Sequence, residues 1–115
     1  MVGDAALPRI LTDPGYAAIY QALLTETSRL GPFEVRYRKS AVQLVRPDGA
    51  GFAAVAPGSD GLTLTVVVDT VLTSPRLSAA LPVSGEAWNQ RATIGAVSEV
   101  DDDVLDWLAA AYHRT

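Results

Sequence analysis

The sequence contains no cysteine, and its one histidine is His113. Without cysteine there is no thiolate nucleophile, no disulfide and no cysteine-ligated zinc or iron–sulfur site. With a single histidine, a multi-histidine metal site is excluded and a Ser-His-Asp triad has no well-placed base. We therefore expect no metal and no cofactor. The missing cysteines also favour a cytoplasmic location, because small secreted domains often depend on disulfides.

Long apolar runs and an excess of positive charge are missing as well. The most apolar run, 62–68, is far too short to cross a bilayer, and residues 1–7 lack the regions of a signal peptide, so we expect no membrane association. The net charge of −4 argues against a dedicated nucleic-acid binder, which needs clustered cations for phosphate contacts. Neither a phosphate-binding glycine loop nor a Gly-x-Ser-x-Gly nucleophile motif occurs.

What is present suits one globular domain over 1–115, with a loosely ordered lead-in at 1–12. The 115 residues are 49% hydrophobic and 19% charged, enough to bury a core without staples. Asp13 and Pro14 predict a helix start, since aspartate caps free N–H groups and proline fits the first helical position. Apolar residues then recur at helical spacing up to Leu30, and Gly31 with Pro32 ends the helix.

Beyond this helix the hydrophobic period changes to two, which is typical of half-buried strands. Turns rich in glycine, proline and aspartate separate the first strands, and short turns predict antiparallel pairing. The predicted strands are 33–38, 41–45, 51–56, 62–68 and 91–97. Between the last two, Ser74 and Pro75 predict a short helix up to Leu81.

A second long helix is predicted after residues 98–101, where Val100, Val104, Trp107 and later apolar residues share one face. The order predicts an α+β fold, with a single antiparallel sheet of about five strands and an N-terminal and a C-terminal helix packed on one face. Glu99 and Asp101–Asp103 suggest either a divalent-metal cluster or a helix N-terminus, and we favour the latter because adjacent carboxylates on a helix point apart.

Two groups of residues are candidate sites. The first is basic and contains Arg36, Arg38 and Lys39, with Arg46 or Gln43 joining if the neighbouring strand pairs closely. It predicts either an anion-binding surface or a solvated face whose charges deter edge aggregation. The second consists of Trp88, Asn89, Gln90 and Arg91, and it suggests either a pocket lining or a core tryptophan with exposed polar neighbours.

Several segments, in this order and spacing, resemble the domain-of-unknown-function 5655 family of small bacterial proteins, which is broadly similar to the YdhG-like proteins. The segments are LGP at 30–32, KSAVQL at 39–44, FAAV at 52–55, LTLTV at 62–66, PRL at 75–77, Trp88, VDDDVLDWL at 100–108 and AY at 111–112.

The resemblance implies an α+β fold with a curved antiparallel sheet and no known activity. Lys39 and Trp88 are the positions it marks as typical. In similar proteins the segment after the tryptophan often leads to a histidine, whereas here it reads Asn89, Gln90 and Arg91. A histidine-dependent role in relatives therefore does not transfer to this chain.

Two functional hypotheses follow. The first is a non-catalytic binding or interaction module, whose partner is another protein, a second copy of the chain or a small anionic ligand bound by Arg36, Arg38 and Lys39. The alternative is an enzyme of unrecognised type with a small anionic substrate near Lys39, Trp88 and Arg91, because lysine and arginine can supply acid–base or electrostatic catalysis.

Overall fold

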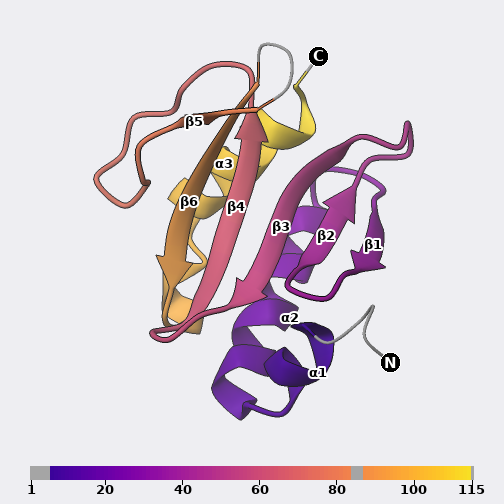
Figure 1. Cartoon of the computed structure of the whole chain (residues 1–115), viewed down its shortest axis with the longest axis vertical. Coiled ribbons are helices and arrows are strands. Elements are labelled where there is room, and N and C mark those ends of the chain that lie inside the picture. Colours follow the sequence, from indigo (N-terminus) through magenta and orange to yellow (C-terminus); the bar gives the residue numbers. More distant parts are fainter. Residues whose placement is uncertain (1–5, 84–86, 115) are drawn as a thin grey trace.

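The sheet has six strands in the order β1-β2-β3-β4-β6-β5, and every neighbouring pair is antiparallel. This arrangement comes from a computed structural model, which describes residues 6–83 and 87–114. The strands are β1 (Glu34–Tyr37), β2 (Val42–Val45), β3 (Gly51–Pro57), β4 (Leu62–Val68), β5 (Leu81–Pro82) and β6 (Trp88–Ile94). The predicted α+β class is confirmed, with one strand more than expected (Figure 1).

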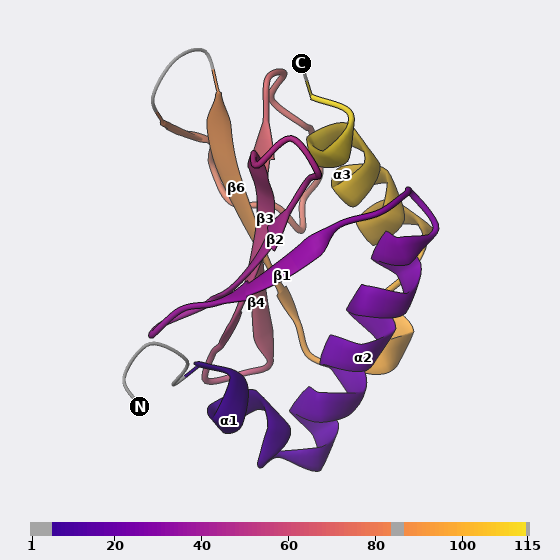
Figure 2. The same cartoon turned by 90° about the vertical axis from the view of Figure 1, so that its right-hand side faces the viewer.

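The two long helices cover one face of this sheet and leave the other face open (Figure 2). The helices are α1 (Ala6–Leu11), α2 (Pro14–Ser28) and α3 (Asp102–Tyr112), and the 3-10 helix η2 (Val97–Glu99) comes directly before α3. The predicted cap of α2 is confirmed, because the Asp13 carboxylate accepts hydrogen bonds from the N–H groups of Gly15 and Tyr16 at 2.9 and 3.2 Å.

Helix α1 corrects the expectation of a loose lead-in. Its Ala6 and Ile10 are completely buried in the main core, so this short helix is packed rather than free. Six residues give too short a hydrophobic pattern to reveal a helix from the sequence. Residues 1–5 of the expected lead-in lie outside the described residues.

The core lies between the helices and one sheet face. In β4 the alternation is strict: Leu62, Leu64, Val66 and Val68 are buried, whereas Thr63, Thr65 and Val67 are turned to the other face. From α3, the side chains of Val104, Trp107, Leu108 and Ala111 join the same core.

The segment before β6 differs from its prediction. No helix forms at 74–81; the chain makes turns there, and Leu81–Pro82 pairs with the start of β6 as β5. Strand β6 spans Trp88–Ile94, whereas the sequence predicted a strand at 91–97. A polar residue, Gln90, occupies an inward position of this strand and interrupts the apolar alternation that would have marked its beginning.

Gln90 is 2% exposed and holds the loop between β4 and β5. Its side-chain carbonyl accepts the N–H of Leu72 at 2.8 Å, and its amide donates to the Leu72 carbonyl at 2.9 Å. One amide side chain thus satisfies both backbone groups of a loop residue, as a neighbouring strand would. Among the described residues, no helix is long and apolar enough to cross a membrane.

Candidate binding surface

A continuous cross-strand row of side chains runs over the open sheet face. The strand registers pair Arg36 with Gln43, Gln43 with Ala54, Ala54 with Thr65, and Thr65 with Arg91. Directly paired residues of an antiparallel sheet share a face, so these five side chains lie side by side across five strands. The row therefore has an arginine at each end, with Gln43 beside Arg36 and the small side chains of Ala54 and Thr65 in its middle.

The row is wide. Four strand spacings of about 4.8 Å place the Cα atoms of Arg36 and Arg91 roughly 19 Å apart. The neighbouring row pairs Ala56, Thr63 and Thr93, which are also small. Because these side chains are short, the middle of the open face protrudes little above the sheet backbone.

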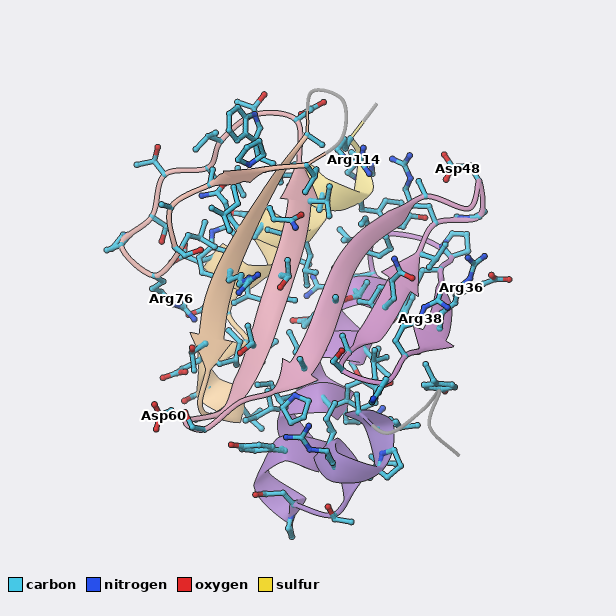
Figure 3. All side chains as sticks on the ribbon, viewed as in Figure 1. Arg36, Arg38, Asp48, Asp60, Arg76 and Arg114 are labelled. Atoms are coloured by element: carbon cyan, nitrogen blue, oxygen red, sulfur yellow. The ribbon has the colours of Figure 1, made fainter. Side chains whose placement is uncertain are left out.

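The positive charge is concentrated at the β1 end of the row, where Arg36, Arg38 and Lys39 form what we call the basic edge. All three are exposed. Arg36 has one acidic neighbour, Glu34, at a long 3.7 Å, and the Arg36 side chain remains 46% exposed. Arg38 donates to the side-chain carbonyl of Gln43 at 3.4 Å, so the expected participation of Gln43 is observed. Figure 3 shows Arg36 and Arg38 together on this side of the sheet.

Arg46, the other residue expected to join this group, is used elsewhere. Its guanidinium donates to the Tyr112 carbonyl at 3.1 Å and to the Arg114 carbonyl, and pairs with Asp48 at 3.0 Å. Only 16% of its side chain is exposed. Arg46 therefore caps the carbonyl end of α3 and ties the β2–β3 turn to that helix.

The structure separates the three residues of the enzyme hypothesis. Trp88 and Arg91 are an odd number of positions apart on β6 and so point to opposite faces: Trp88 is half-buried against the core, whereas Arg91 is exposed on the open face. Lys39 lies in the turn between β1 and β2, with β2, β3 and β4 between it and β6. The three side chains cannot contact one small substrate, and the geometry gives no support to a site at this position.

The acidic run before α3 behaves as a helix N-terminus, as favoured from the sequence. The Asp101 carboxylate accepts the N–H of Val104 at 3.3 Å and pairs with Arg76 at 2.9 Å. Its slight burial acts to raise the pKa of Asp101, but the hydrogen bonds from Arg76 and Val104 outweigh that effect and lower the pKa. Over the described parts of the chain, no three His, Asp or Glu side chains are grouped as a metal site would require.

Arg76 is a structural residue that the sequence did not indicate. Besides Asp101 it contacts the face of Trp107, with its guanidinium carbon 5.0 Å from the ring centroid, and donates to the Glu99 carbonyl at 2.9 Å. It thereby joins the loop after β4 to the beginning of α3. A solitary arginine in a loop carries no sequence signal of such a role, because its partners lie far along the chain.

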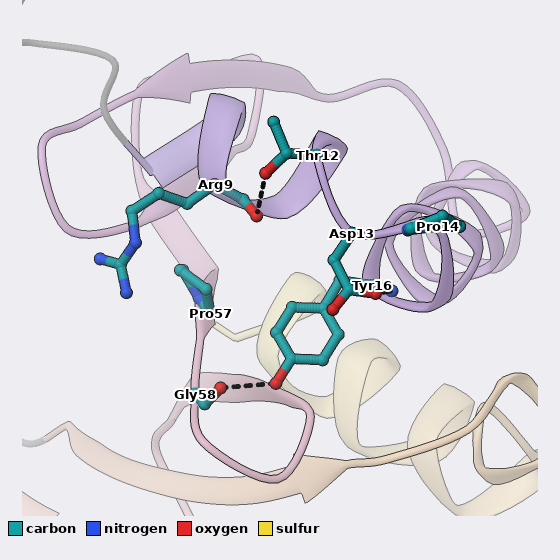
Figure 4. A pocket seen from close by; sticks show the side chains of 7 residues that line it. All are labelled: Arg9, Thr12, Asp13, Pro14, Tyr16, Pro57 and Gly58. Carbon is teal, nitrogen blue, oxygen red and sulfur yellow. Dashed lines mark hydrogen bonds between the residues drawn. The ribbon is translucent and has the colours of Figure 1, made fainter.

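An open hollow of about 500 Å³ lies where α1 and α2 meet the β3–β4 turn. Figure 4 shows Arg9, Asp13 and Tyr16 around it, with the Arg9 guanidinium directed away from Asp13. The Tyr16 hydroxyl donates to the Gly58 carbonyl at 2.6 Å, and the Asp13 carboxylate caps α2. The polar groups of Asp13 and Tyr16 in this hollow are thus engaged in hydrogen bonds within the fold. The basic edge, whose side chains are exposed, is therefore the better candidate for binding.

The fold and surface define a small α+β protein with one helix-covered sheet face, one open sheet face and a basic edge. A family model described as "Domain of unknown function (DUF5655)" matches residues 10–115, so the chain belongs to this family, as its resemblance predicted. No curated protein and no solved structure matched the chain.

Proposed function

We propose that this protein is a non-catalytic binding module and that its basic edge binds an acidic segment of a protein partner. The observation that carries the proposal is the accumulation of Arg36, Arg38 and Lys39 at one side of the open sheet face, in a chain whose net charge is −4. Of these three cations, Arg36 alone has an acid within ion-pair distance among the described residues, and that contact is long.

Carboxylates are the chemistry that this surface fits. A guanidinium group presents paired N–H donors that match both oxygens of a carboxylate, and two such groups follow each other on the same face here. The side chains are exposed rather than set in an enclosed cavity, which favours an extended partner over a small molecule. A short acidic segment can be confined to the basic edge, whereas the longer phosphate backbone of a nucleic acid would extend over the rest of a chain with net charge −4.

Charge reversal at the basic edge tests the proposal. The probe is a hexaglutamate peptide titrated at low salt against the wild-type chain and against the double variant Arg36→Glu/Arg38→Glu. We expect the variant to weaken binding at least about tenfold, because each reversal replaces an attraction by a repulsion. Binding by the wild-type chain should also fall as salt is added, since the contacts are exposed.

The matched control is Arg9→Glu/Arg29→Glu, which changes the net charge equally at two exposed positions outside the basic edge, on α1 and at the end of α2. This control should retain binding within about twofold, since exposed charges that do not contact the peptide are screened. Equal loss in both double variants would show that only the net charge matters, and the proposal would be wrong. Failure of the wild-type chain to bind hexaglutamate at low salt would equally reject it.

A further inference from the structure

The two edges of the sheet differ in how far their backbone groups are paired. At the β6 side, β5 pairs with the start of the strand, and Ser78 then pairs with Arg91: its N–H donates to the Arg91 carbonyl at 2.8 Å and its hydroxyl accepts the Arg91 N–H at 3.0 Å. At the opposite side, β1 pairs with β2 alone. Figure 1 shows β1 at the right-hand margin of the sheet with no labelled element along its outer side.

The unpaired backbone groups of β1 can be identified from the register. The Arg38 N–H donates to the Ala41 carbonyl at 2.9 Å, so the backbone groups of Arg38 point toward β2. Arg36 lies two residues earlier on the same strand and is paired with Gln43, so its backbone groups point toward β2 as well. In an antiparallel pair the intervening residues point the other way. The N–H and carbonyl groups of Val35 and Tyr37 therefore face outward, and neither residue has another backbone partner within 6–83 and 87–114.

The side chains of β1 alternate between the two faces of the sheet. Arg36 and Arg38 lie on the open face with the rest of the basic edge. Val35 and Tyr37 are on the helix-covered face, where Val35 is half-buried and Tyr37 is 48% exposed. An incoming strand would thus find cations on one face and partly exposed apolar surface on the other.

We propose that β1 accepts an extended peptide of a partner protein as an additional strand, and that this peptide alternates acidic with apolar side chains. The inference rests on the proposed function and specifies the form of its acidic segment. Main-chain hydrogen bonds to Val35 and Tyr37 provide binding, and the alternating side chains provide selection. The acids meet Arg36 and Arg38, while the apolar side chains cover Tyr37 and Val35.

Edge cations also serve to prevent indiscriminate pairing of strands. A strand paired along β1 would give the same protection, as β5 and Ser78 do for part of β6. An edge left open but charged repels basic strands and penalises apolar ones, which would leave the cations unpaired. It therefore admits an acidic strand in preference to others.

The decisive variant is Tyr37→Pro, with Tyr37→Thr as its matched control. Both remove the phenol ring, but only proline removes the outward N–H. Proline is tolerated on an edge strand where its missing donor faces solvent, so the hydrogen bonds between β1 and β2 remain. The probe is an eight-residue peptide of alternating Glu and Val, with its termini blocked.

We expect Tyr37→Thr to bind this peptide and Tyr37→Pro to bind it at least about tenfold more weakly, since a strand-addition hydrogen bond and its neighbours are lost. A second measurement is independent of how the proline variant folds. The same peptide with N-methylated valines cannot donate to β1 from these residues, so its affinity for the wild-type chain should fall at least about tenfold.

The outcomes separate this inference from the function on which it rests. If proline and N-methylation leave binding unchanged while Arg36→Glu/Arg38→Glu abolishes it, strand addition is wrong and the acidic-partner function stands. If charge reversal also has no effect, both fail. If sedimentation shows wild-type dimers that Tyr37→Pro dissociates, the open edge serves a second copy of the chain, and the partner-peptide inference is overturned.

Discussion

Gly61 and Gly49 are both turn residues with positive φ, at +145° and +91°, but their surroundings differ. A Cβ atom on Gly61 would lie 2.3 Å from the backbone carbonyl oxygen of Ile94, which belongs to β6 and cannot move aside cheaply. A Cβ atom on Gly49 would meet nothing within 4 Å. Gly61 is therefore required for close approach of two chain segments, and Gly49 for its dihedral angles alone.

We predict that Gly61→Ala lowers the free energy of unfolding by about 1–3 kcal/mol more than Gly49→Ala does. Both substitutions suffer the positive-φ penalty, so their difference reports the backbone contact, whose cost should resemble that of overpacking. Urea denaturation of the two variants and the wild-type chain measures the difference. Equal stabilities would mean that the β3–β4 turn moves freely away from β6.

Among the elements, the β4–β5 loop depends on a side chain for its attachment. Its Leu72 backbone is paired with the Gln90 side chain rather than with another strand. Because Gln90 is buried, removing its amide leaves a donor and an acceptor of Leu72 without partners, which costs more than the loss of an exposed hydrogen bond.

We predict that Gln90→Ala makes the Leu72 amide exchange with solvent at least about tenfold faster, equivalent to about 1.4 kcal/mol. Hydrogen exchange resolved by residue is the measurement. The control is Gln21→Ala, which removes an exposed glutamine of α2 and should leave Leu72 protected. Unchanged protection in Gln90→Ala would show that contacts other than this amide hold the loop.

Elements with strong local signals could be predicted from the sequence, and those that depend on distant partners could not. Asp13 with Pro14 marked the start of α2, and the apolar run 62–68, rich in β-branched residues, marked β4. Strand β5 forms because Leu81–Pro82 lies next to β6, which no local pattern encodes. The start of β6 was missed because Gln90 is polar yet inward, an assignment that requires knowledge of Leu72.

The candidate surface was likewise predictable only where a local pattern determined it. The period of two placed Arg36 and Arg38 on one face, but the choice between Gln43 and Arg46 as their neighbour depended on strand register. The register selects Gln43, and the end of α3 engages Arg46. The proposed grouping of Lys39 with Trp88 and Arg91 failed because proximity across a sheet depends on strand order, which the sequence did not specify.

For the molecule as a whole, one buried ionisable group makes stability sensitive to alkaline pH. Burial, with a smaller contribution from nearby Tyr37, raises the pKa of Tyr20 from 10.0 to about 12. The folded state therefore keeps the Tyr20 proton at pH values where the unfolded chain releases it. This contribution to stability is complete below about pH 10 and is lost as the pH rises to about 12.

We predict that the free energy of unfolding of the wild-type chain decreases between pH 10 and pH 12 by up to about 3 kcal/mol more than that of Tyr20→Phe, which has no phenol to titrate. Chemical denaturation at a series of pH values checks this. Parallel curves for the two proteins would indicate that the Tyr20 hydroxyl is hydrated in the folded state.

The unequal edges of the sheet also limit how copies of this protein can aggregate through their strands. A sheet with two open edges can add copies at both sides, so such growth has no natural end. Here β5 and Ser78 pair with part of β6 at one side, whereas β1 has no strand along its outer side within the described residues. Pairing of β1 with β1 of another copy would use the longer open edge of both copies at once, so growth through this strand stops at a closed pair.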